Sequence, residues 1–113
     1  ILIVMNPNEN IVLTEAVFYT LLALHTPLHG YGIMQETKSM TGGRLVLSAG
    51  TLYGAISSML DKGWIKALPG EEDSRRKEYV ITDTGKQVAR AELNRLHELV
   101  ANGEKIINKT DIL

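Results

Sequence analysis

Glycine and proline residues cut this sequence of 113 residues into short segments, and their positions limit the elements it can form. Pro27, the pair Gly42–Gly43 and Gly63 each follow a stretch in which apolar residues recur every three or four positions. Such a period indicates a helix with one buried face, and glycine or proline just beyond it is a typical helix end. The sequence therefore predicts three helices, over about residues 14–25, 31–40 and 49–62.

Local signals place the starts and the buried faces of these helices. Thr14 and Ser48 precede apolar periods, and each can accept a hydrogen bond from an unpaired backbone N–H as an N-cap. The tight connection 27–30 joins the first helix to the second. The predicted buried positions of the first helix are Leu13, Val17, Leu21 and Leu24. Those of the second and third helices are Ile33, Met34, Thr37, Met40, Leu52, Ala55, Ile56, Met59 and Leu60.

Two apolar-rich segments, residues 64–68 and 77–81, follow the third helix. The polar stretch 69–76 separates them, which is typical of a β-hairpin with a long loop. The run 45–47 could form a minimal strand. Two helices joined by a tight turn and followed by a hairpin describe a winged helix-turn-helix. The expected fold class is therefore mainly α with a small β-hairpin, extended by a long C-terminal helix.

The last predicted helix runs from about Asp83, capped by Thr82, to Lys109. Its apolar positions are four, three, four, three and four residues apart. This alternation is typical of a coiled-coil seam and predicts a homodimer. The dimerisation residues are then Ala89, Leu93, Leu96, Val100, Gly103 and Ile107. The alternative is a terminal helix that folds back on its own domain.

These elements predict four regions along the chain. Residues 1–12 are expected to be flexible or partly helical, and residues 13–82 to form the winged helix-turn-helix. Residues 83–109 are expected to form the dimerisation helix, and residues 110–113 a frayed tail.

The third helix has a second face of small and hydroxyl-bearing side chains. A helix that enters the major groove of DNA needs side chains that allow close approach and form hydrogen bonds, and its first turn favours phosphate. The predicted contacts to double-stranded DNA are Ser48, Gly50, Thr51, Tyr53, Gly54, Ser57, Ser58 and Lys62. The alternative is an ordinary solvent-exposed helix face, with Ser48 acting only as a cap.

Three consecutive basic residues, Arg75, Arg76 and Lys77, stand at the base of the predicted hairpin loop. Beside a groove-bound helix they could grip phosphates or place an arginine in the minor groove. Residues 71–73 are acidic and would oppose phosphate, so we expect the acidic tip to point away from DNA. A solvated charged loop is the alternative.

Composition restricts the remaining function classes. The formal net charge is −1, so a basic DNA-binding surface has to be local. The absence of cysteine fits a reducing cytoplasm, and no apolar run approaches the ~20 residues of a membrane helix. No pair of the three histidines has metal-site spacing, and no glycine-rich phosphate loop follows a strand. We therefore expect no cofactor, metal, catalytic residue or membrane contact. A winged-helix module that binds protein or ligand, with weak or lost DNA binding, stays open as the alternative function.

Several short motifs in order carry a family likeness. They are Leu13-Thr14-Glu15, Leu21-Leu22-Ala23-Leu24, His29-Gly30-Tyr31-Gly32-Ile33, Gly50-Thr51-Leu52-Tyr53, Lys62-Gly63-Trp64-Ile65, Arg75-Arg76-Lys77-Glu78-Tyr79 and Thr82-Asp83-Thr84-Gly85. Together, over about residues 13–99, they resemble the PadR family of bacterial winged-helix transcriptional regulators. The short tail resembles the subgroup with a single C-terminal helix.

The resemblance implies a homodimer on a pseudo-palindromic operator, usually as a repressor, and in some members release by small aromatic or drug-like effectors. Two departures from the family pattern concern the third helix, which is the one expected to read DNA. Ala49 stands where the family often has proline, and Ser57-Ser58 stands where a basic residue is common. For an effector, Phe18 and Tyr19 are candidate cavity-lining residues, with core packing as the alternative for Phe18.

Overall fold

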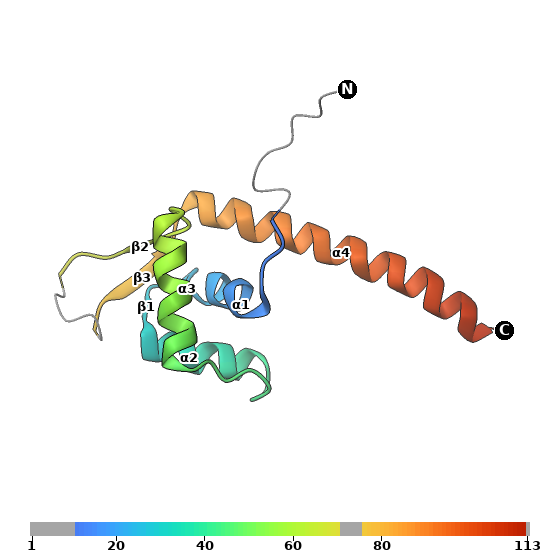
Figure 1. The fold of residues 1–113 in the computed structure, drawn as a ribbon, viewed down its shortest axis with the longest axis horizontal. Coiled ribbons are helices and arrows are strands. Elements are labelled where there is room, and N and C mark those ends of the chain that lie inside the picture. Colours follow the sequence, from blue (N-terminus) through green and yellow to red (C-terminus); the bar gives the residue numbers. More distant parts are fainter. Residues whose placement is uncertain (1–10, 71–75, 113) are drawn as a thin grey trace, which may run out of the picture.

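The computed structural model describes residues 11–70 and 76–112. Three helices gather at one end of the molecule: α1 (Glu15–Ala23), α2 (Gly30–Met40) and α3 (Ala49–Asp61). A small sheet beside them consists of β1 (Leu28–His29), β2 (Ile65–Ala67) and β3 (Glu78–Ile81). The long helix α4 (Asp83–Ile112) leaves this domain as an arm (Figure 1).

Side-chain caps fix the starts of the three short helices. Thr14 Oγ1 accepts a hydrogen bond from the Val17 N–H (3.2 Å), and Ser48 Oγ accepts one from the Thr51 N–H (3.1 Å). Both caps confirm the sequence prediction. The start of α2 was not predicted: His29 Nδ1 accepts from the Gly32 N–H (3.0 Å), so the helix begins at Gly30 instead of Tyr31.

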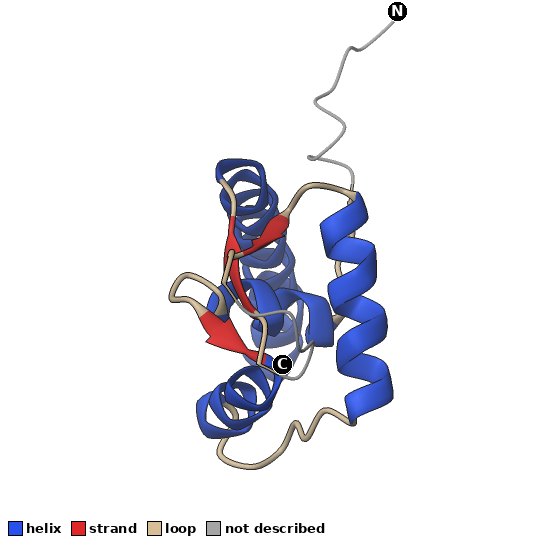
Figure 2. Ribbon diagram, turned by 90° about the vertical axis from the view of Figure 1, so that its left-hand side faces the viewer, coloured by secondary structure: helices blue, strands red, loops and turns tan. Residues whose placement is uncertain are grey.

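The sheet is antiparallel in the order β1-β3-β2, with Leu28 opposite Tyr79 and Ile65 opposite Ile81. The hairpin is confirmed, whereas β1 was missed. The prediction of a strand at 45–47 is wrong: these residues belong to neither a helix nor the sheet. Both edges of the central strand β3 are already taken, by β1 and β2 (Figure 2).

The core lies between the three short helices, the sheet and the start of α4. The most deeply buried apolar side chains are Leu21, Leu24, Ile33, Leu52, Met59 and Val88. Two predicted core residues lie outside it, because Met40 is 40% exposed and Leu60 is 37% exposed. Each stands at the last turn of its helix, where the packed face ends.

The joint between α3, the hairpin and α4 is tight. Gly63 ends α3 with a φ of 73°, a conformation that favours glycine. Thr82 then ties α4 to this point: its N–H donates to the Trp64 carbonyl (3.0 Å), its hydroxyl donates to the Gly63 carbonyl (2.6 Å), and its Oγ1 caps the Gly85 N–H (3.1 Å). A methyl group on Gly85 would overlap the Trp64 carbonyl oxygen. Hydrogen bonds thus join the end of α3 directly to the start of α4.

The limits of the arm differ in part from those predicted. The cap at Thr82 and the start at Asp83 are as expected, but the helix continues to Ile112 instead of ending near Lys109. Residues 110–112, predicted to fray, are helical. Leu113 and residues 1–10 lie outside the described residues, while residues 11–12 are neither helix nor strand.

Candidate nucleic-acid interface

The outer face of α3 contains two glycines and small polar side chains, with the acidic Asp61 at its C-terminal end. Gly50 and Gly54 are exposed, and nothing lies within 4 Å of where a Cβ would stand on either residue. Neither has a positive φ, so conformation and packing within the chain explain neither glycine. The face continues through Ser57 and Ser58, both exposed. It is therefore flat enough for close approach by a bulky partner.

The N-terminal turn of α3 adds hydroxyl groups to this face. Ser48 and Thr51 are exposed, and the Ser48 hydroxyl donates to Thr51 Oγ1 over 3.0 Å. The backbone N–H groups of this turn lie at the positive end of the helix dipole. The predicted reading residues on this side therefore share one accessible surface.

Two residues predicted on the same surface occupy other places. Tyr53 is half-buried and packs on the core, with its phenol above Gly30 at the start of α2. Lys62 follows the last residue of α3, and its Nζ lies 4.9 Å from the centre of the Trp64 ring, a cation–π arrangement. The positive charge at the end of α3 is thus held against Trp64.

The basic residues at the base of the hairpin loop lie beside the start of α2. Arg76 is exposed and lines a hollow of about 300 Å³ together with His29 and Glu78, while Lys77 is half-buried. Arg75 and the acidic residues 71–73 lie outside the described residues. Arg76 and Lys77 thus bring positive charge toward the helix-turn-helix, in partial competition with the exposed Glu78.

This geometry agrees with the comparisons with known proteins. The model of the transcriptional regulator PadR-like family matches residues 19–91. The chain belongs to the PadR-like family. No curated protein matches its sequence.

Solved structures show the same architecture. A transcriptional regulator from Clostridium thermocellum is 28% identical, with a TM-score of 0.62 over 84% of this chain and 90% of its own. A PadR family transcriptional regulator from Eggerthella lenta is 27% identical, with a TM-score of 0.67 over 80% of each chain. A PadR-like transcription factor from Bacteroides fragilis, at 22% identity and a TM-score of 0.64 over 80% of this chain and 87% of its own, supports the fold. The protein is thus a winged-helix transcriptional regulator of the PadR type.

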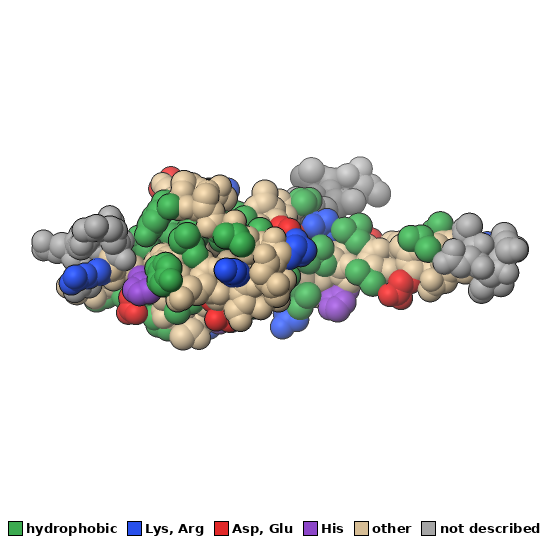
Figure 3. All heavy atoms as spheres, turned by 90° about the horizontal axis from the view of Figure 1, so that it is seen from below, with side chains coloured by type: hydrophobic (Ala, Val, Ile, Leu, Met, Phe, Trp, Pro, Cys, Tyr) green, Lys and Arg blue, Asp and Glu red, His purple; other side chains and the backbone are tan. Residues whose placement is uncertain are grey.

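The arm of this PadR-family chain carries apolar side chains far from the core (Figure 3). Val100 and Ile107 of the predicted seam are exposed, and Leu93, Leu96 and Gly103 are half-buried. Ala89 is different because it is buried in its own domain. Sequence reasoning missed Leu99 and Ile106, which are 53% and 63% exposed. They stand beside Val100 and Ile107, and a helical stripe wider than a strict seam would have included them.

An ion pair within α4 lies where the arm leaves the domain. Glu92 is 3% exposed, and Arg95 donates to both its carboxylate oxygens, from Nε over 2.6 Å and from Nη2 over 2.8 Å. Arg95 holds the pKa of Glu92 below its ordinary value; burial opposes this effect, and a hydrogen bond with the Leu13 backbone adds to it. A second pair joins Arg44 to Glu15 across the surface between α1 and the loop after α2, and likewise lowers the pKa of Glu15.

A cavity of about 400 Å³ lies between α1 and α4. Its apolar part contains Phe18, Leu22, Ala89 and Leu93, and its basic part contains His25, Lys86 and Arg90. Phe18 therefore lines a cavity, as predicted. Tyr19 does not line it: it packs edge-on against Phe18, with ring centres 6.3 Å apart. The basic residues were missed, because the sequence does not show that α4 passes α1 at this point.

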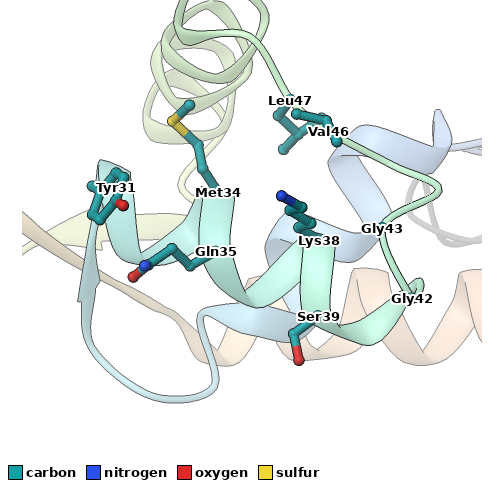
Figure 4. A pocket seen from close by; sticks show the side chains of 9 residues that line it. All are labelled: Tyr31, Met34, Gln35, Lys38, Ser39, Gly42, Gly43, Val46 and Leu47. Atoms are coloured by element: carbon teal, nitrogen blue, oxygen red, sulfur yellow. The ribbon is translucent and has the colours of Figure 1, made fainter.

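A second hollow, of about 600 Å³, lies between α2 and the loop that leads into α3 (Figure 4). Tyr31, Met34, Lys38 and Val46 are among the residues that line it. It ends one residue before Ser48, the cap of α3. Among the described residues, no group of histidine, aspartate and glutamate side chains could hold a metal ion. None of the described helices is both long and apolar enough to cross a membrane.

Proposed function

We propose that the protein is a homodimeric regulator that reads a pseudo-palindromic operator with the outer face of α3, acts as a repressor, and is released by a small effector. The single observation that carries the reading role is the pair Gly50 and Gly54, open on the outside of the helix. Glycine inside a helix costs about 1 kcal/mol relative to alanine. Since none of the described residues comes within 4 Å of this space, we assign it to the wall of a DNA groove.

The phosphate contacts are assigned to the hairpin. Exposed Arg76, with Lys77 and Arg75 beside it in sequence, supplies positive charge that the outer face of α3 lacks. Phosphate contacts give affinity and register, whereas base edges give specificity. We therefore assign affinity mainly to the hairpin and selectivity to Ser48, Thr51, Ser57 and Ser58.

The dimer contact is assigned to the outer part of α4. Leu96, Leu99, Val100, Gly103, Ile106 and Ile107 form one stripe along the helix. A second copy covering this stripe would remove its apolar surface from water. A two-fold dimer can then place two reading helices about 34 Å apart, in successive turns of the major groove.

Fluorescence anisotropy tests the reading role. The probe is a duplex from upstream of the protein's own gene, compared with a scrambled duplex. Gly54→Leu should lower the affinity for the upstream duplex at least 100-fold, because the side chain would stand where the groove wall comes close. Its thermal unfolding midpoint should not fall, since the position is open. Unchanged binding would refute the reading role.

The salt dependence of binding tests the phosphate contact of the hairpin. Log affinity falls against log salt with a slope of about −0.9 per phosphate neutralised. Arg76→Ala should reduce the steepness by about 0.9. Lys105→Ala, which removes the same charge from the arm, should leave the slope unchanged. No selective binding by the unaltered protein at low salt would favour the other candidate, a winged-helix module that binds protein or ligand.

The cavity between α1 and α4 is assigned to the effector. Its apolar part suits a small aromatic ring, and His25, Lys86 and Arg90 suit an acidic group on that ring. In calorimetry, benzoate should bind and benzyl alcohol should bind at least tenfold more weakly. Arg90→Gln should abolish this preference, and equal binding of the two compounds would contradict the assignment. Repression and its relief are measured with a reporter gene behind the upstream duplex.

A further inference from the structure

The backbone conformation at Gly30 does not require a glycine. It opens α2, and its φ is not in the left-handed region that favours glycine. It is nevertheless buried, and a methyl group there would overlap the Tyr53 hydroxyl and lie 2.9 Å from Cζ of the same ring. The absence of a side chain at Gly30 thus makes room for a phenol ring from α3.

Tyr53 is the bulky member of an otherwise small surface. Its neighbours Gly50 and Gly54 are exposed, and no described atom lies within 4 Å of where a Cβ would stand on either residue. Tyr53, in contrast, is half-buried and packs on the core. The ring therefore leans away from the open face of α3 and toward α2. A side chain in this position has its main contacts inside the protein.

The same ring also lies near Tyr79 on β3. Tyr79 on β3 is buried, and it belongs to the core cluster on which Tyr53 packs. The pKa of Tyr79 is raised, chiefly by burial and to a smaller extent by the neighbouring phenol of Tyr53. Tyr53 thus lies where α3, the start of α2 and the middle strand of the sheet come together.

We propose that Tyr53 is a positioning residue, whose ring fills the space above Gly30 and fixes the angle at which α3 is held against α2 and the hairpin. This inference rests on the proposed reading role of α3, and it replaces the direct DNA contact expected for Tyr53. Selectivity depends on the orientation of α3, because hydrogen bonds from its hydroxyl groups to base edges need donor and acceptor within narrow limits of distance and angle. Phosphate contacts depend on it much less.

Four variants test the inference by anisotropy on the upstream and scrambled duplexes. Tyr53→Phe keeps the ring and should bind within threefold of the unaltered protein. Tyr53→Ala and Gly30→Ala should each reduce the ratio of upstream to scrambled affinity at least tenfold, with an unchanged salt slope. Because Gly30→Ala acts by displacing the ring, it should do no further harm when combined with Tyr53→Ala.

Two results would overturn the inference. If Tyr53→Phe loses as much selectivity as Tyr53→Ala, the hydroxyl contacts DNA directly. If the losses of Gly30→Ala and Tyr53→Ala add up in the double variant, the two residues do not act together.

A measurement without DNA separates this inference from the proposed function. Thermal unfolding of the same variants should show that Gly30→Ala lowers the midpoint in the presence of Tyr53 but not in the Tyr53→Ala background. Backbone amide NMR shifts should change along residues 48–54 in Gly30→Ala. If the unaltered protein binds no duplex selectively, the reading role fails and these two measurements still decide whether the ring positions α3. Equal midpoint losses in both backgrounds, or unchanged amide shifts, would refute it.

Discussion

The two halves of α4 contain similar side chains in opposite surroundings. In the first half, Val88, Ala89 and Glu92 are buried, because α1 and β3 pack against them. In the second half, Leu99 and Ile106 are 53% and 63% exposed, beyond the point where α4 leaves the domain as an arm (Figure 1). One helix therefore completes its own domain and then presents an apolar surface. The apolar content of a helix does not by itself tell whether its partner is the same chain or another.

The two glycines of α4 give the largest expected contrast between these halves. Gly85→Ala would place a methyl group against the Trp64 carbonyl and 2.7 Å from Cγ1 of Ile81. Because this backbone has no room to move, we expect a loss of about 3 kcal/mol in the free energy of unfolding. Urea titration followed by circular dichroism measures it. A loss below ~0.5 kcal/mol would show that the joint at Trp64 is loose.

Charges placed on the apolar positions should separate the two halves by their effect on assembly. Leu99→Asp with Ile106→Asp should raise the dimer dissociation constant at least 100-fold, while each monomer stays folded. Val88→Asp, the matched change in the first half, should unfold the domain because it buries an unpaired charge. Sedimentation velocity measures the dimer dissociation, and circular dichroism measures the loss of folding. An unaltered protein that is already monomeric at micromolar concentration would refute the role given to the second half.

The Glu92–Arg95 pair predicts an acid sensitivity located in the first half. The folded-state pKa of Glu92 lies below its unfolded value. Its contribution to stability is therefore complete above an unfolded pKa of about 4.3, and is lost as the pH falls through the folded pKa. Glu92→Gln should cost about 1–3 kcal/mol at pH 7, with a smaller cost at pH 3. Glu98→Gln, on the exposed side of the same helix, is the control, and an equal effect of the two changes would contradict the assignment.

The smallest expected effect is at the second glycine. No described atom lies within 4 Å of where a Cβ would stand on Gly103. Gly103→Ala should therefore stabilise the helix by up to about 1 kcal/mol. We expect this gain to raise the midpoint of thermal unfolding by a few degrees. Weaker dimerisation by Gly103→Ala in sedimentation would instead show that the partner arm approaches closely at this position.

The sequence was sufficient where a residue acts through its own local chemistry. Thr14, Ser48 and Thr82 cap helices, and Gly63 ends one, because each needs only its nearest neighbours along the chain. The two-residue strand β1 escaped prediction because it is too short to show a period. Residues 45–47 have strand-like composition but pair with none of the three strands.

Contacts between distant segments account for what the sequence did not show in the candidate site. Tyr53 looked like part of an open polar face, and only its place above Gly30 reveals its packing role. Ala89 fitted the seam by spacing, yet that turn of α4 lies against α1. In each case the partner lies on another element, and spacing along one helix carries no information about it.

The hydrogen bonds of Thr82 to Gly63 and Trp64 have a consequence for the DNA itself. Because these bonds tie the end of α3 to the start of the arm, the crossing of two arms in the proposed dimer sets the separation of the two reading helices. One extra base pair at the centre of an operator moves a half-site by about 3.4 Å and turns it by about 35°. A joint held this tightly cannot absorb that change by bending. The number of base pairs between half-sites would then identify the operator as strictly as the bases within them.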